Sequence, residues 1–76
     1  MDEAELQADA AEVAVANGIA DARFGSVFLR VGEALRGEFG DARDATLGIG
    51  YADFGVVIDG EVYEVRLTRR GVGGMH

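Results

Sequence analysis

Several acidic side chains lie close enough along the chain to suggest paired-carboxylate chemistry. Asp41 and Asp44 form one such pair, and Asp2, Glu3 and Glu5 cluster at the start of the chain. Two-carboxylate catalysis needs a dry pocket that raises the pKa of one acid, and these acids lie in polar or terminal segments of a 76-residue chain. A loose calcium site at 41–44 is an alternative, although the segment lacks the ligand spacing of a calcium loop. We therefore expect no catalytic acid pair and no metal site.

The residue types needed for nucleophilic catalysis are scarce. The chain has no Cys, its only Ser is Ser26, and its only His is the last residue, His76. A Ser nucleophile needs a His base within hydrogen-bonding reach, and Ser26 falls on the outer face of a predicted helix. Residues 48–53 match only the first two glycines of a dinucleotide fingerprint, and the triplet Asp-Phe-Gly at 53–55 lacks the rest of the kinase signature. We expect a protein that is not an enzyme and carries no cofactor.

One cluster of basic residues lies near the end of the chain. It consists of Arg66, Arg69 and Arg70, and a strand through this segment would place Arg66 and Arg70 on one face. Such a cluster could grip a phosphate backbone or an acidic protein surface. The chain has 14 acidic residues against seven basic ones and a net charge of -7, so its field repels nucleic acid. A solvated strand end is the simplest interpretation of the cluster; as a ligand, a protein partner or the acidic N-terminal segment of another copy is favoured over nucleic acid.

The charge is also unevenly placed, and every basic residue is Arg, with no Lys. Residues 1–22 carry six acids and no base, whereas residues 60–76 carry two Glu and three Arg. Neighbouring copies could use this asymmetry for head-to-tail contacts. The composition is typical of a halophilic or GC-rich source. The acidic N-terminus does not begin with the basic and apolar segments of a secretory signal, so we expect a cytoplasmic protein.

Two helices should precede the strands. Residues 3–17 are rich in Ala, and Asn17-Gly18 is a helix stop. The apolar stripe of this helix is thin: Leu6, Ala10 and Val13, to which Ala14 could be added. Residues 22–39 form a stronger amphipathic helix, capped by Asp21 and ended by Gly40. A strand at 26–31 is the competing interpretation. The apolar face of the second helix comprises Phe24, Val27, Phe28, Val31, Leu35 and Phe39, and its polar face Ser26, Arg30, Glu33 and Arg36.

The C-terminal half contains a β-hairpin signal, Asp59-Gly60 between two apolar runs. A two-residue turn there pairs Asp53 with Arg66 on one face of the hairpin. The other face is apolar and should face the helices through Phe54, Val56, Tyr63, Val65 and Leu67. Upstream, the alternation of Leu47, Ile49 and Tyr51 is out of phase with this pattern. Either a bulge lies near 52–55, or the chain turns there and makes a third strand.

The predicted fold is α+β, with two N-terminal helices packed on a C-terminal antiparallel hairpin or three-stranded meander. Residues 1–70 should form one domain, and residues 71–76 a flexible tail. We expect a non-enzymatic interaction or assembly module that self-associates or docks on a larger complex, such as a virion or connector. The alternative is a small regulator that binds nucleic acid or mimics it. The expected partner-binding residues are Arg66, Arg69, Arg70, Val57, Val62 and Tyr51.

Overall fold

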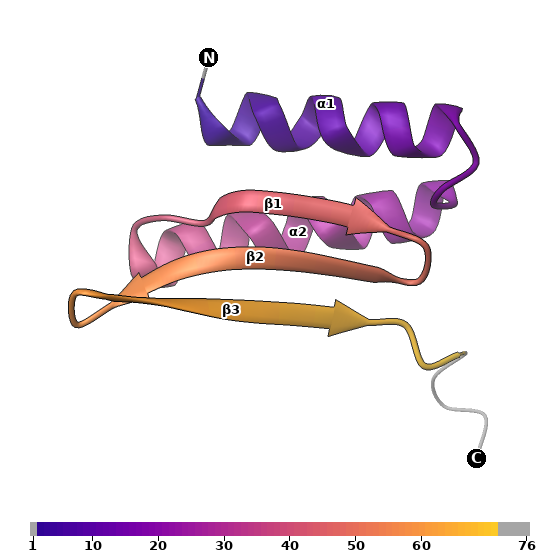
Figure 1. Ribbon diagram of the computed structural model, residues 1–76. Helices are drawn as coiled ribbons and strands as arrows, with labels where there is room; N and C mark the ends of the chain where they lie inside the picture. Colours follow the sequence, from indigo (N-terminus) through magenta and orange to yellow (C-terminus); the bar gives the residue numbers. More distant parts are fainter. Residues whose placement is uncertain (1, 72–76) are drawn as a thin grey trace.

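The computed structural model describes residues 2–71 and shows an α+β fold (Figure 1). Two helices precede a three-stranded antiparallel meander whose strand order is β1-β2-β3. The elements are α1 (Glu3–Ala16), α2 (Ala22–Phe39), β1 (Arg43–Gly48), β2 (Tyr51–Ile58) and β3 (Glu61–Thr68). The predicted helix-then-strand order is therefore confirmed, in its three-stranded form. Most of the predicted tail, residues 72–76, lies outside the described residues.

Both helices begin at an Asp that accepts a hydrogen bond from the first turn. Asp2 Oδ1 accepts from the Glu5 amide at 2.9 Å, and Asp21 Oδ1 accepts from the Phe24 amide at 2.7 Å. The second helix ends at Gly40, whose φ of 81° is the left-handed conformation that glycine adopts without strain. The alternative strand at 26–31 is wrong, because these residues lie within α2. The large apolar side chains of this segment are three and four residues apart, a spacing that fits a helix.

The predicted buried face of α1 is wrong for its large members, Leu6 and Val13. Leu6 and Val13 are 53% and 57% exposed, whereas Gln7, Ala11 and Ala14 are buried. The reason is close packing against α2, where Gly25 and Gly32 are also buried. Small side chains on α1 and glycines on α2 let the two helices approach, and larger side chains on α1 are turned outward.

The packing of α2 follows the prediction in part. Phe24 and Phe28 are buried, but Phe39 at the end of the helix is 37% exposed. The half-buried members of the predicted face are Val27, Val31 and Leu35. In the core the Phe28 ring stacks on Phe54 with centroids 5.1 Å apart. The other fully enclosed side chains of the core belong to Ala42, Ala52 and Val56.

The register of the β2–β3 hairpin agrees with the predicted one at every pair, including Asp53 opposite Arg66. The phase change upstream comes from a third strand, β1, which pairs antiparallel with β2, but the chain turns at 49–50 and not near 52–55 as expected. A bulge at 52–55 is the wrong interpretation. The irregularity instead lies in β1 between Arg43 and Thr46, where Asp44 has a φ of 52°.

The helices do not cover the whole sheet. In Figure 1 the sheet is seen from its helix-free face, with α2 behind β1 and β2 and α1 beside β1. The inward side of β3 therefore receives less cover than predicted. Tyr63 is 48% exposed, while Val65 and Leu67 are half-buried. Tyr63 was expected in the core, and its exposure follows from the position of β3 beyond the helix layer.

Candidate interaction surface

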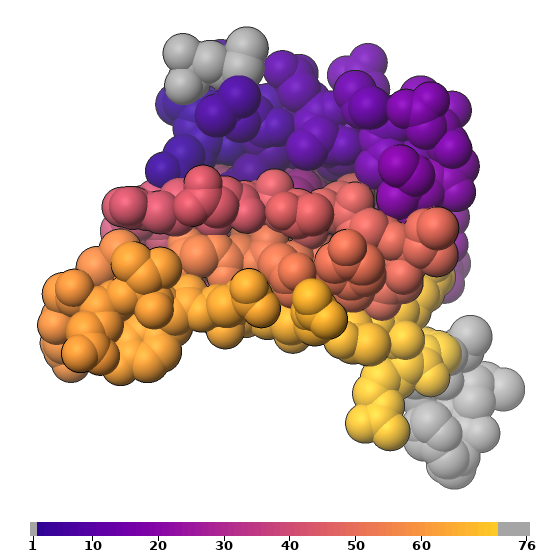
Figure 2. Space-filling view, viewed as in Figure 1, coloured from indigo at the N-terminus to yellow at the C-terminus, as the bar shows by residue number. Residues whose placement is uncertain are grey.

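The outer edge of β3 is a free strand edge within residues 2–71. Only β2 pairs with it there, and β3 forms the lower margin of the molecule in Figure 2. The Arg69 amide donates to Gly50 O at 3.0 Å, which continues the β2–β3 register and shows that residue 69 directs its backbone to β2. Because this direction alternates along a strand, residues 61, 63, 65 and 67 also bond to β2. Residues 62, 64, 66 and 68 direct their amides and carbonyls to the open edge.

Apolar side chains lie on both faces of this edge. Val62 is 66% exposed on the helix-free face, and Tyr63 is 48% exposed on the helix side. The Tyr63 hydroxyl donates to Glu61 Oε2 at 3.1 Å. Val57, which pairs with Val62, is half-buried. Of the predicted apolar contact residues, Val62 is thus the one most available to a partner.

Arg66 is held on the helix-free face by its cross-strand neighbour. Its Nε and Nη2 atoms donate to the two carboxylate oxygens of Asp53 at 2.7 and 3.0 Å. The guanidinium also lies over the Tyr51 ring, 4.7 Å from the centroid. The hydrogen bond from Arg66 lowers the pKa of Asp53 below its usual value. Asp53 is therefore bonded to Arg66, as the predicted hairpin register required.

Arg69 contacts a different element from Arg66. Arg69 Nη1 donates to Asp21 Oδ2 at 2.6 Å, and its guanidinium lies 5.9 Å from the Phe24 ring centroid. Arg69 is therefore associated with the start of α2, whereas Arg66 bonds to β2. Arg70 is exposed and lies two residues beyond Thr68, where β3 ends, so it is not on a strand face shared with Arg66 as expected. Two of the three arginines already have a carboxylate partner.

A groove of about 460 Å³ lies where β3 leaves the helix layer. Phe24 and Val27 of α2 line it together with Leu67 of β3, and Arg23, Arg69 and Arg70 are also in its wall. The groove places further apolar surface beside the inward side of β3. It arises because α2 packs on β1 and β2 and leaves the last strand partly uncovered.

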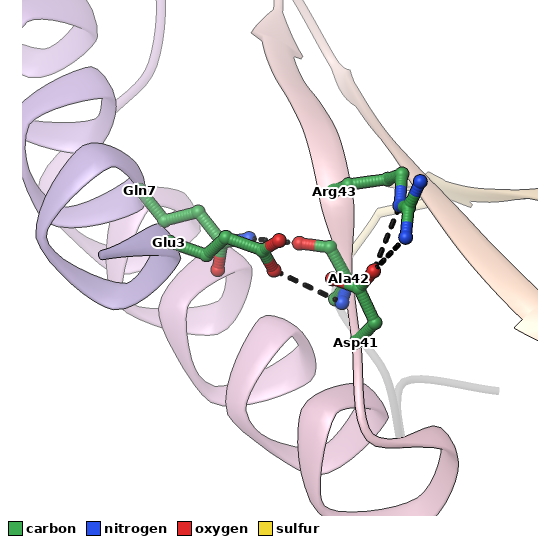
Figure 3. Close-up of polar contacts among 5 residues, drawn as sticks. All are labelled: Glu3, Gln7, Asp41, Ala42 and Arg43. Atoms are coloured by element: carbon green, nitrogen blue, oxygen red, sulfur yellow. Dashed lines mark hydrogen bonds and ion pairs between the residues drawn. The ribbon is translucent and has the colours of Figure 1, made fainter. Parts of the chain in front are cut away.

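A second polar cluster joins the start of α1 to the connection between α2 and β1 (Figure 3). Gln7 is 3% exposed, and its Nε2 donates to Ala42 O at 2.6 Å. Its Oε1 accepts from Arg36, which is half-buried and thus not on the outer face predicted for it. Glu3 Oε2 accepts from the Ala42 amide at 3.2 Å. Sequence reasoning missed Gln7, whose only signal was a polar residue beside a thin apolar stripe.

The acids of this cluster have opposite pKa shifts. The neighbouring Asp41 carboxyl and partial burial raise the pKa of Glu3, whereas the hydrogen bond with Glu3 and one from Arg43 lower the pKa of Asp41. Arg43 Nε donates to Asp41 Oδ2 at 2.8 Å, and Asp44 is exposed on β1. Among residues 2–71, no group of three or more acidic or histidine side chains is arranged to hold a metal ion. The hydrogen bonds of this cluster connect α1 to α2 and to the segment between α2 and β1.

Comparison with known proteins identified no similar protein. No protein-family model matches the chain, and neither the curated proteins nor the solved structures contain a significant match. Within the described part of the chain, neither helix has the length and apolar character needed to cross a membrane.

Proposed function

We propose that this protein is a non-enzymatic interaction or assembly module that binds a protein partner through the open edge of β3. The observation that carries the proposal is an eight-residue strand with an unpaired edge in residues 2–71 and apolar side chains exposed on both of its faces. An exposed strand edge offers a row of unpaired amides and carbonyls to an incoming strand. Val62 and Tyr63 add apolar contacts on either side of that row.

The opposite edge of the sheet differs in ways that support this choice. β1 has six residues, its register shifts between Arg43 and Thr46, and Asp44 adopts a positive φ. The helix α1 also packs beside it. Shortening, irregularity and cover are three of the means by which proteins protect strand edges. β3 is longer and pairs with β2 without a break, so its edge lacks these protections.

A photoreactive residue at the edge tests the proposal in the expressing cell. Val62→p-benzoylphenylalanine should give covalent protein adducts on irradiation, in at least severalfold higher yield than the same substitution at Val13. Val13 is a matched control because it is a valine of similar exposure, at 57% against 66%, on α1. Glu64→Pro should remove the adducts, since the Glu64 amide faces the open edge and does not bond to β2.

The folded state of Glu64→Pro is checked by circular dichroism, and the comparison of positions 62 and 13 does not depend on it. Equal adduct yields at the two positions would overturn the proposal. So would adducts at position 62 that persist in a folded Glu64→Pro variant.

A further inference from the structure

We infer that the occupant of this edge is a second copy of the same chain, paired antiparallel through β3 about a two-fold axis at Val65. The inference rests on the proposed function and specifies its partner. It joins two three-stranded sheets into one continuous six-stranded sheet. The arrangement is a closed, symmetric dimer in which the same surface is used on both copies.

The backbone geometry of β3 permits this register. In an antiparallel pair, hydrogen-bonded residue pairs alternate with non-hydrogen-bonded pairs. With Val65 opposite Val65, Glu64 lies opposite Arg66 and Val62 opposite Thr68. All four of these residues direct their backbone groups to the open edge, as the bond between Arg69 and Gly50 requires. The pairing would therefore satisfy amides and carbonyls that are unpaired within residues 2–71.

The charges along β3 are complementary in this register. Glu64 of each copy faces Arg66 of the other, and Glu61 of each copy faces Arg69 of the other. Because Arg66 also bonds to Asp53 of its own chain, a row of alternating charges would run from β2 of one copy to β3 of the next. Opposite charges in facing positions stabilise a strand pair, and like charges destabilise it.

The neighbouring registers are disfavoured by the same charges. A shift of two residues in one direction places Glu64 opposite Glu64, and the same shift in the other direction places Arg66 opposite Arg66. A parallel in-register pair would also bring like charges together. A shift of one residue would set edge-facing backbone groups against groups that already bond to β2. The charge pattern therefore selects a single register among its neighbours.

The inward side chains also match in this register. Tyr63 of each copy faces Leu67 of the other, and Val65 faces its own equivalent. A two-fold axis normal to the sheet keeps both α2 helices on the same side, so these residues would form one apolar stripe between the two helix layers. This stripe is the part of the inward face that α2 leaves uncovered. The dimer would thus use surface that the monomer does not bury.

Single cysteines test the register directly, because the chain has no Cys of its own. Under mild oxidation, Val65→Cys should form a disulfide-linked dimer, since non-hydrogen-bonded antiparallel pairs bring Cβ atoms within disulfide range. Val62→Cys is the control. Although Val62 is more exposed, its equivalent in the second copy lies opposite Thr68 and out of reach. Faster cross-linking at position 62 than at position 65 would overturn the inferred register.

Charge-reversing substitutions test whether the partner is a second copy of the chain. By analytical ultracentrifugation in 0.15 M NaCl, which screens the repulsion between chains of net charge -7 beyond about 8 Å but preserves contacts between facing side chains, the wild type should dimerise reversibly. Glu64→Arg should weaken the dimer about tenfold or more, because two arginines then face each other at each end of the pair. The double variant Asp53→Arg with Arg66→Glu keeps the ion pair within the chain and should weaken its own dimer similarly.

A mixture of these two charge variants should form a heterodimer about as stable as the wild-type dimer, because every facing pair is again of opposite charge. Failure of the mixture to associate would overturn the inference. A wild type that stays monomeric at millimolar concentration, while the residue at position 62 is still cross-linked to another protein in cells, would overturn the self-pairing and leave the proposed function standing. If the wild type does not dimerise and position 62 is not cross-linked to any protein, both the self-pairing and the proposed function are overturned.

Discussion

Replacing Gln7 by Met should destabilise the fold although it exchanges a polar residue for an apolar one of similar length. Gln7 is 3% exposed, donates to Ala42 O at 2.6 Å and accepts a hydrogen bond from Arg36. Met can fill the space of Gln7 but can make neither of these bonds. The Ala42 carbonyl would lose its side-chain donor, and the Arg36 guanidinium would lose its acceptor in a half-buried position.

The two lost bonds set the size of the effect. A neutral hydrogen bond contributes about 1 kcal/mol, and one to a charged group about 1.5–3 kcal/mol. Because Arg36 is only half-buried and can regain water, we take the low end of the second value. We therefore expect a loss of about 2–3 kcal/mol. A chain of this length has a total stability of about 4–11 kcal/mol, so the variant should still fold.

Urea denaturation followed by circular dichroism measures this loss, with Leu6→Ala as the matched control on the same helix. Leu6 is 53% exposed, so its truncation should cost no more than about 0.5 kcal/mol. An apolar stripe of Leu6, Ala10 and Val13 facing the core would give the reverse order. If Leu6→Ala costs more than Gln7→Met, the orientation of α1 described above is refuted.

Three further substitutions test the helix contact and the polar cluster. In urea titrations Gly32→Ala should destabilise the protein by about 1–2 kcal/mol, because an added Cβ would collide with Gln7 Oε1, whereas Gly37→Ala meets open space and should stabilise it by up to about 1 kcal/mol. A common sign for the two would contradict the packing of α1 on α2. Glu3→Gln should stabilise the protein at neutral pH, because the pKa of Glu3 is raised above 4.5 beside Asp41 and its ionised form is disfavoured in the folded state. In melting curves this gain should disappear as the pH falls through that raised pKa and below 4.5, and a larger gain in acid than at neutral pH would refute it.

The elements that could be predicted from the sequence are those fixed by neighbouring residues. The Asp59-Gly60 turn sets the register of the hairpin, and the caps at Asp21 and Gly40 lie within a few residues of the helix that they bound. The face of α1 could not be predicted in this way. It depends on a buried Gln whose partners are 29 and 35 residues away, and on glycines of another helix.

On the candidate surface, too, contacts fixed by neighbouring residues could be predicted, and contacts between distant residues could not. The pairing of Asp53 with Arg66 follows from the hairpin register, so it could be predicted. The contact of Arg69 with Asp21 joins residues 48 positions apart and depends on where the end of β3 meets the start of α2. The exposure of Tyr63 depends on how far α2 reaches across the sheet, which the alternation of β3 does not encode.

The hydrogen bonds of α1 to Ala42 have a consequence for the order of folding. Gln7 and Glu3 bond to a residue 35 and 39 positions further along the chain, whereas β2 and β3 are joined by a two-residue turn. Contacts between distant residues carry a larger loop-closure entropy and form later than local ones. During synthesis α1 leaves the ribosome before the strands, yet it would dock on them only after the β2–β3 hairpin has formed. We expect amide exchange in α1 to report the earliest local opening of the native state.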